Sequence, residues 1–176
     1  MKFSKSKLKN IIQEELDSVL AENARRRALV SILMKILKTG PDSYARALAK
    51  SAKRDEFDIK KDPGAALSTL GAYATKDFTK AYRNNGCPSV EREDRPSYDK
   101  DLLKCKTLNA AREDLNNNIV LNVSDGDVKA ARRLMAFIPS KSNYAKSKYM
   151  SVMTTRAYSA IYKKLKKQGA GEEDDL

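Results

Sequence analysis

Apolar residues recur along this chain at the three- and four-residue intervals that are typical of amphipathic helices. The first 22 residues carry one such stripe, with polar residues on the opposite face. The stripe consists of Leu8, Ile11, Ile12, Leu16, Val19 and Leu20. A second helix is expected from about residue 24 to residue 38, because Leu29, Ile32 and Leu33 continue the pattern. Gly40 followed by Pro41 should end it, so the pattern predicts two helices with a boundary near residue 23.

Residues that cap or initiate helices mark further helix starts along the chain. Asp42 can cap a third helix. Asp62 followed by Pro63 predicts the start of a fourth, which should stop at Gly86. Its apolar stripe consists of Leu67, Leu70, Ala74, Phe78 and Tyr82. A fifth helix is expected from about residue 100 to residue 116. The stretch NNNIVLNV that follows has low helix propensity, so it predicts a short extended link.

Two more helices are expected after this link. Ser124, with Asp127 three residues later, resembles a capping box for a helix that ends before Pro139. One long helix should then run from about residue 143 to residue 167 and stop at Gly169. The whole pattern predicts an all-α protein, an irregular multi-helix bundle of about six to seven helices.

Loop composition and charge divide the expected bundle into segments. Prolines and charged residues follow Gly86 closely, which favours a long exposed loop. We expect an amphipathic leader helix over residues 1–22, an N-terminal helical lobe over 23–86, a loop over 87–99, a basic C-terminal helical lobe over 100–168 and an acidic mobile tail over 169–176. The tail either folds back on the basic lobe or only keeps the protein in solution.

Composition limits the chemistry open to this chain. There is no histidine among the 176 residues, which excludes mechanisms of the Ser-His-Asp and Cys-His types and leaves the two cysteines without a partner for a metal site. Two cysteines make no disulfide framework, so a reduced setting is expected, and nothing near Cys87 supplies a base to activate it as a nucleophile. We expect no enzymatic activity, no cofactor and no metal.

The net charge of +12 predicts a polyanionic partner, either nucleic acid or an acidic surface. No apolar run approaches the roughly 20 residues that span a bilayer, so no membrane partner is expected.

Positive charge is concentrated near the C-terminus. Between residues 128 and 168 there are eleven basic residues and no acidic one. The expected phosphate contacts are Lys129, Arg132, Arg133, Lys146, Lys148, Arg156, Lys163, Lys164, Lys166 and Lys167. The alternative is that these side chains only solvate the outer face of a terminal helix. Since the chain carries no helix-turn-helix, zinc-finger or RNA-recognition signature, binding to nucleic acid should be non-specific.

The opening MKFSKSKLKNIIQEELDSVLAE resembles a leader of the form MKxxKxxLxxIIxEELxxVLxE, found at the N-termini of otherwise dissimilar proteins of marine tailed phages. The resemblance covers only the first 22 residues. This leader is similar to the capsid-targeting sequences of internal head proteins, which a prohead protease removes after a Leu/Ile-x-Glu triplet. Leu20, Ala21 and Glu22 match that triplet at the expected helix boundary. The resemblance implies an address that is cut off after assembly, whereas the alternative is an ordinary amphipathic helix packed on the domain.

Together these features favour a phage-like internal head protein, located in the virion or the host cytoplasm. Its leader would dock on a capsid or scaffold protein through Leu8, Ile11, Ile12, Leu16 and Val19, while its basic body binds nucleic acid non-specifically. Two alternatives remain open: a structural capsid, neck or tail component that contacts acidic protein surfaces, and a small effector that binds a host factor.

Overall fold

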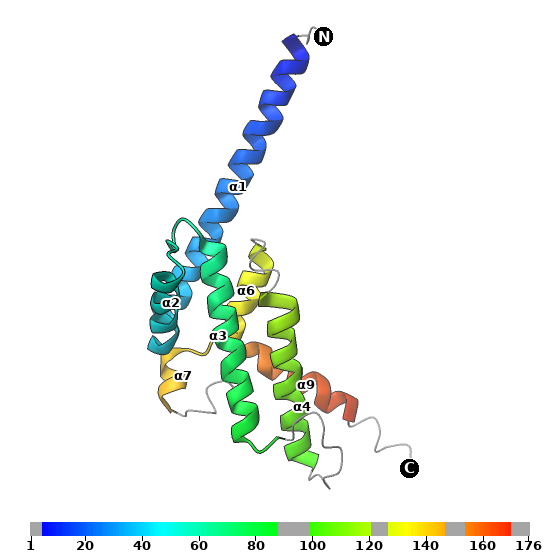
Figure 1. Cartoon of the computed structure of the whole chain (residues 1–176). Coiled ribbons are helices and arrows are strands. Elements are labelled where there is room, and N and C mark those ends of the chain that lie inside the picture. Colours follow the sequence, from blue (N-terminus) through cyan, green and yellow to red (C-terminus); the bar gives the residue numbers. More distant parts are fainter. Residues whose placement is uncertain (1–4, 88–98, 121–126, 147–153, 170–176) are drawn as a thin grey trace.

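The computed structural model describes residues 5–87, 99–120, 127–146 and 154–169 (Figure 1). Its elements are the α-helices α1 (Lys5–Thr39), α2 (Asp42–Arg54), α3 (Pro63–Asn84), α4 (Asp99–Glu113), α6 (Val128–Phe137), α7 (Lys141–Lys146) and α9 (Arg156–Gly169), and the π-helix η1 (Asp114–Val120). These ranges contain no strand, and the predicted all-α multi-helix bundle is confirmed.

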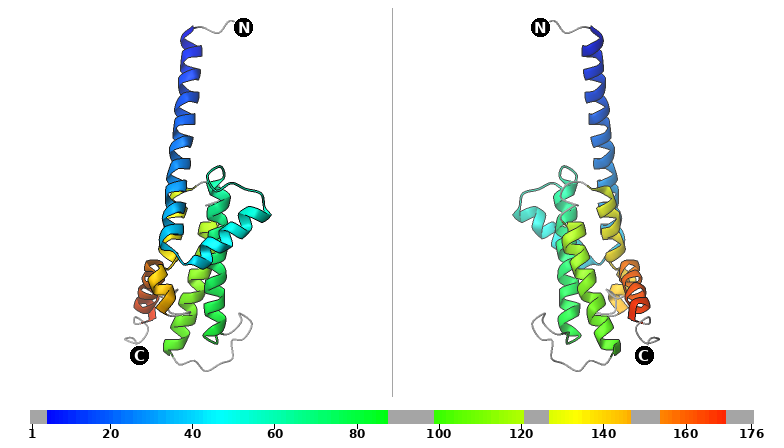
Figure 2. Two further views of the ribbon diagram at one scale, coloured as in Figure 1. Left: turned by 90° about the vertical axis from the view of Figure 1, so that its left-hand side faces the viewer. Right: turned by 90° about the vertical axis from the view of Figure 1, so that its right-hand side faces the viewer.

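The N-terminal helix α1 is one continuous element of 35 residues, so the expected boundary near residue 23 is wrong. The segment between the two apolar stripes, LAENARRRA, consists almost entirely of strong helix formers and contains neither glycine nor proline. As far as the side chains of α1 are described, only its C-terminal part is packed, through Leu29, Ile32, Leu33 and Ile36. The rest projects away from the bundle as a rod (Figures 1 and 2).

The hydrophobic core forms around α3, which contacts α1, α2, α4, α6 and η1. Four of the five residues of its predicted stripe, Leu67, Leu70, Ala74 and Phe78, are buried, and the fifth, Tyr82, is partly buried. One cluster of buried side chains joins residues of the 23–86 range to residues of the 100–168 range. An edge-on contact between Phe78 and Phe137, with ring centroids 5.8 Å apart, links α3 to α6.

The start of α3 is the predicted one. Asp62 lies at the N-cap, its carboxylate accepts a hydrogen bond of 2.9 Å from the backbone N–H of Ala65, and Pro63 occupies the first turn. At the start of α2 the expectation was wrong, because Pro41 holds the cap position and Asp42 is the first helical residue.

The expected extended link after α4 is a π-helix over its described part, from Asp114 to Val120. Leu115 and Ile119 of η1 are fully buried, so their packing against α3 and α6 outweighs the low helix propensity of the asparagines between them. Ser124, the expected cap of the next helix, lies outside the described residues. The observed cap of α6 is Asp127, which accepts a hydrogen bond of 2.7 Å from the N–H of Lys129.

The long C-terminal helix expected from residue 143 to residue 167 is also wrong, because Thr154 and Thr155 form a turn before α9. The Thr155 side chain is buried, and its hydroxyl accepts a hydrogen bond of 3.1 Å from the N–H of Tyr158. This is the bond of an N-cap threonine, which starts a helix rather than continuing one.

Cys87 and Cys105 form a disulfide, with their Cα atoms 5.5 Å apart. The expectation of two reduced, unconnected cysteines is corrected here. The bond ties the residue that follows the C-terminal turn of α3 to the middle of α4. In the part of the chain that the structure describes, no helix has the length and apolar character needed to cross a membrane.

Candidate nucleic-acid interface

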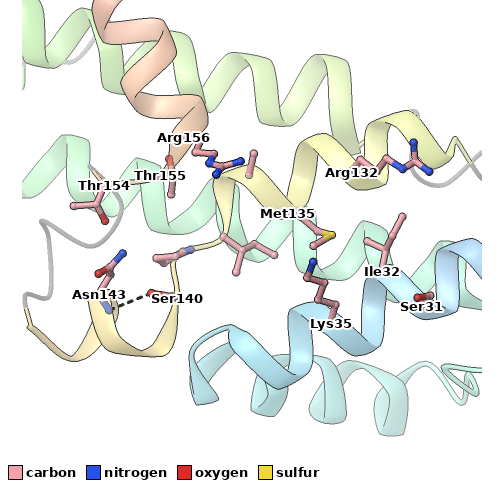
Figure 3. A pocket seen from close by; sticks show the side chains of 13 residues that line it. Ser31, Ile32, Lys35, Arg132, Met135, Ser140, Asn143, Thr154, Thr155 and Arg156 are labelled. Carbon is pink, nitrogen blue, oxygen red and sulfur yellow. Dashed lines mark hydrogen bonds between the residues drawn. The ribbon is translucent and has the colours of Figure 1, made fainter.

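A pocket of about 670 Å³ opens where α1, α6, α7 and the start of α9 meet (Figure 3). Three cationic side chains line it: Lys35 from α1, Arg132 from α6 and Arg156 from α9. Figure 3 shows the Lys35 ammonium and the Arg156 guanidinium pointing toward the space between these helices, while Arg132 extends along α6. No acidic residue belongs to the lining. The pocket is therefore a site of positive potential whose charge is not neutralised from within.

Neutral hydrogen-bonding groups complete the lining. They are Ser31, Ser140, Asn143, Thr154 and Thr155. The hydroxyl of Ser140 accepts a hydrogen bond of 3.4 Å from the N–H of Asn143, which orients the first turn of α7 beside the pocket (Figure 3). Hydroxyl and amide groups beside arginine and lysine are the donors that proteins use to bind phosphate oxygens.

Two of the predicted phosphate contacts, Arg132 and Arg156, line this pocket, and sequence reasoning missed the third cation, Lys35. Lys35 lies on the polar side of the most apolar stretch of the chain. Only the packing of α1 against α6 brings it beside residues far along the sequence, and nothing in the local pattern indicated that packing.

The outer face of α9 extends the positive surface. Arg156, Lys163 and Lys167 follow one another at intervals of seven and four residues, so they share one side of the helix. That side lies opposite Tyr158 and Ile161, which belong to the core or pack against it. All three basic side chains are exposed, as are Lys164 and Lys166 beside them.

The remaining predicted contacts divide into three cases. Lys129 is exposed in the first turn of α6. Arg133 forms an ion pair with Asp114 of η1, with its Nη2 2.6 Å and 2.8 Å from the two carboxylate oxygens, so much of its charge is already neutralised. The side chains of Lys146 and Lys148 lie outside the described residues.

The described side chains of the predicted docking stripe are exposed on the projecting part of α1. Ile11, Ile12, Leu16, Val19 and Leu20 are between 40% and 63% exposed. The side chain of Leu8 is not among those described. An exposed row of large aliphatic side chains is typical of a surface that contacts another protein.

The proposed cleavage triplet, Leu20, Ala21 and Glu22, lies in the middle of α1 and not at a helix end. Its backbone is therefore held in a regular helix, whereas proteases cut preferentially at exposed loops. A cut after Glu22 requires this part of α1 to unwind first.

In the described ranges, no group of three or more cysteine, aspartate or glutamate side chains is placed to bind a metal ion. Comparisons of this chain with protein-family models, with curated proteins and with solved structures found no match.

Proposed function

We propose that this chain binds nucleic acid without sequence preference, through a basic surface made of the α1–α6–α9 pocket and the outer face of α9. The observation that carries the proposal is that Lys35, Arg132 and Arg156, from three helices, line one pocket that has no acidic lining residue. Basic side chains that only keep the outer face of a helix in contact with water would not be expected to line one pocket from three helices.

Phosphate is the ligand that suits this surface best. Arginine presents a planar fork of donors that matches phosphate oxygens, and lysine adds a mobile point charge. Arg156, Lys163 and Lys167 span about 16 Å along α9, given a rise of 1.5 Å per residue. A row of that length can follow several phosphates of one strand, and each phosphate neutralised releases bound counterions.

The biological setting is that of a phage-like internal head protein, which is located in the virion or, before assembly, in the host cytoplasm. The resemblance of the first 22 residues to phage leaders supports this setting. The exposed stripe on α1 would dock on a capsid or scaffold protein, and the bundle would remain free to contact packaged nucleic acid.

Fluorescence anisotropy with unrelated DNA duplexes across a salt series tests the binding. The wild type should bind all duplexes alike, with affinity falling steeply as salt rises. The double variant Lys35→Glu/Arg156→Glu should weaken binding at least tenfold, since it reverses two charges in the pocket. The matched control Lys60→Glu/Lys61→Glu makes the same charge change at two exposed lysines outside the pocket. Equal losses in the two variants would refute a role for the pocket.

A structural role in a capsid, neck or tail is the second candidate, and the five exposed aliphatic side chains of α1 favour it. In that case the chain should form a defined oligomer, or a stable complex with a capsid protein, without nucleic acid. Light scattering after size exclusion measures this directly. Leu16→Lys/Val19→Lys should then abolish assembly while the protein stays folded.

A further inference from the structure

A second basic groove, of about 730 Å³, lies between α2 and α3. Four cationic side chains line it: Arg46, Lys50 and Arg54 from α2, and Lys76 from α3. The lining again contains no acidic residue. This groove belongs to a part of the chain where the sequence shows no unusual run of basic residues, because the four cations are interspersed with apolar and acidic positions.

The cations form a row along one edge of the groove. Arg46, Lys50 and Arg54 follow at four-residue intervals, so each lies about 6 Å farther along α2 and the row is about 12 Å long. Arg54 is paired with the neighbouring Asp55, at 2.7 Å. The pKa of Asp42, near the start of α2, is lowered mainly by its hydrogen bond and ion pair with Lys141 and only to a lesser extent by the charge of Arg46. Arg46, Lys50 and Lys76 make no ion pair within 4.0 Å in the described part of the chain, so the groove keeps a positive excess.

The floor and the opposite edge of the groove suit a nucleotide chain. Small side chains such as Ala47, Ala72 and Ser68 leave room, and Ser51 and Thr69 add hydroxyls that bind phosphate oxygens. Tyr73, which is half-buried, lines the groove next to the cations. An aromatic ring beside a row of cations is the arrangement that binds single strands, because an unpaired base stacks on the ring while the phosphates follow the charges. The acidic side chains of a peptide, by contrast, have no planar ring that could stack on Tyr73.

We propose that the α2–α3 groove is a second nucleic-acid site that binds a short single-stranded segment, with Arg46 and Lys50 on the phosphates and Tyr73 under a base. Figure 2 shows α2 and α9 on opposite sides of the bundle, so this site is separate from the basic surface around α9. Together with that surface, the groove lets the chain hold two segments of nucleic acid at once and bridge them. The bridging rests on the function proposed above, whereas binding at the groove itself does not depend on the first site.

Amide chemical-shift mapping by NMR on the full chain, titrated with hexathymidylate, tests the proposal. Backbone amides around Arg46, Lys50 and Tyr73 should shift on addition of the hexanucleotide, as should those around Lys35 and Arg156. In Arg46→Glu/Lys50→Glu the shifts at the groove should vanish while those at the α1–α6–α9 pocket remain. Arg46→Gln/Lys50→Gln, which removes charge without reversing it, is the second variant in case the first unfolds. Lys60→Glu/Lys61→Glu is the control and should retain both sets.

The outcomes separate the two proposals. Shifts at the pocket without shifts at the groove overturn the second site and leave the first standing. Shifts at the groove alone overturn the first and leave the second. Shifts at neither overturn both. If a hexaglutamate peptide shifts the groove amides at the same concentration as hexathymidylate, the groove binds any negatively charged chain. The assignment to nucleic acid would then be overturned.

Stacking on Tyr73 has its own readout. Tyr73→Leu keeps the approximate bulk of the side chain and should weaken hexathymidylate binding at the groove about tenfold, whereas Tyr73→Phe should bind like the wild type. Equal binding by all three proteins would overturn the stacking part of the proposal.

Discussion

At the scale of single residues, the pair of Tyr44 and Asp77 makes stability depend on pH. The Tyr44 hydroxyl donates a hydrogen bond of 2.7 Å to the Asp77 carboxylate, and Tyr44 is almost fully buried. Burial raises the pKa of Asp77 above its usual value near 3.8, against the opposing effects of the Tyr44 hydrogen bond and Lys80. The folded protein therefore holds a proton that the unfolded chain releases at lower pH.

Because the pKa of Asp77 is raised on folding, its contribution to stability is present below the unfolded pKa and is lost as pH rises through the folded pKa. We expect Asp77→Asn, which stays neutral and can still accept from Tyr44, to flatten the fall in unfolding free energy above pH 4. Urea denaturation of wild type and variant at a series of pH values measures this. Parallel curves for the two proteins would contradict it.

Gly71 is required by the close approach of α3 to η1. A Cβ atom at this position would lie 2.9 Å from Cγ2 of Val120, and valine is too stiff to turn aside easily. Gly71→Ala should therefore lower the free energy of unfolding by about 1–2 kcal/mol, despite the better helix propensity of alanine. Denaturation of the double variant Gly71→Ala/Val120→Ala checks the cause, since removing the valine methyl groups should make the Gly71 substitution harmless.

At the scale of elements, the Cys87–Cys105 disulfide ties α3 to α4 across a sequence separation of 18 residues. Closing a loop of about that length stabilises a protein by roughly 3 kcal/mol, mainly by restricting the unfolded chain. Cys87→Ser/Cys105→Ser should lose about this amount in urea denaturation. Reducing agent should destabilise the wild type equally and leave the double variant unchanged; a wild type insensitive to reductant would contradict the prediction.

The elements also show how far sequence reasoning reaches. Buried stripes and caps with a local cause were predictable, as Leu67, Phe78 and the Asp62 cap of α3 show. Element ends decided by tertiary packing were not. Ile119 keeps an asparagine-rich segment helical because it is buried, and no periodicity in that segment indicates it.

The candidate site follows the same division. Arg132 and Arg156 stood out because they belong to a long stretch without acidic residues. Lys35, Lys50 and Tyr73 did not, because only the packing of one helix on another places each of them in a basic pocket. Counting basic residues along the sequence therefore identifies a basic surface only where the residues of that surface belong to one segment of the chain.

At the scale of the whole molecule, the projecting part of α1 and the bundle have separate roles. None of the residues 10–28 with a described side chain is buried, and the core begins at Leu29. Residues 1–22 also carry no net charge, since Lys2, Lys5, Lys7 and Lys9 balance Glu14, Glu15, Asp17 and Glu22. Neither the stability of the bundle nor its positive field should depend on this segment.

A chain lacking residues 1–22 should therefore melt within a degree or two of the full-length protein, on the order of the effect of a neutral surface change, and should bind DNA with unchanged affinity and salt dependence. Thermal denaturation and anisotropy measure both. What the truncation should remove is docking on a capsid or scaffold partner, because the exposed stripe from Ile11 to Leu20 goes with it. A truncated chain that melts far lower would mean that the rod folds back on the bundle in solution. One that loses DNA affinity would place nucleic-acid contacts on α1 itself.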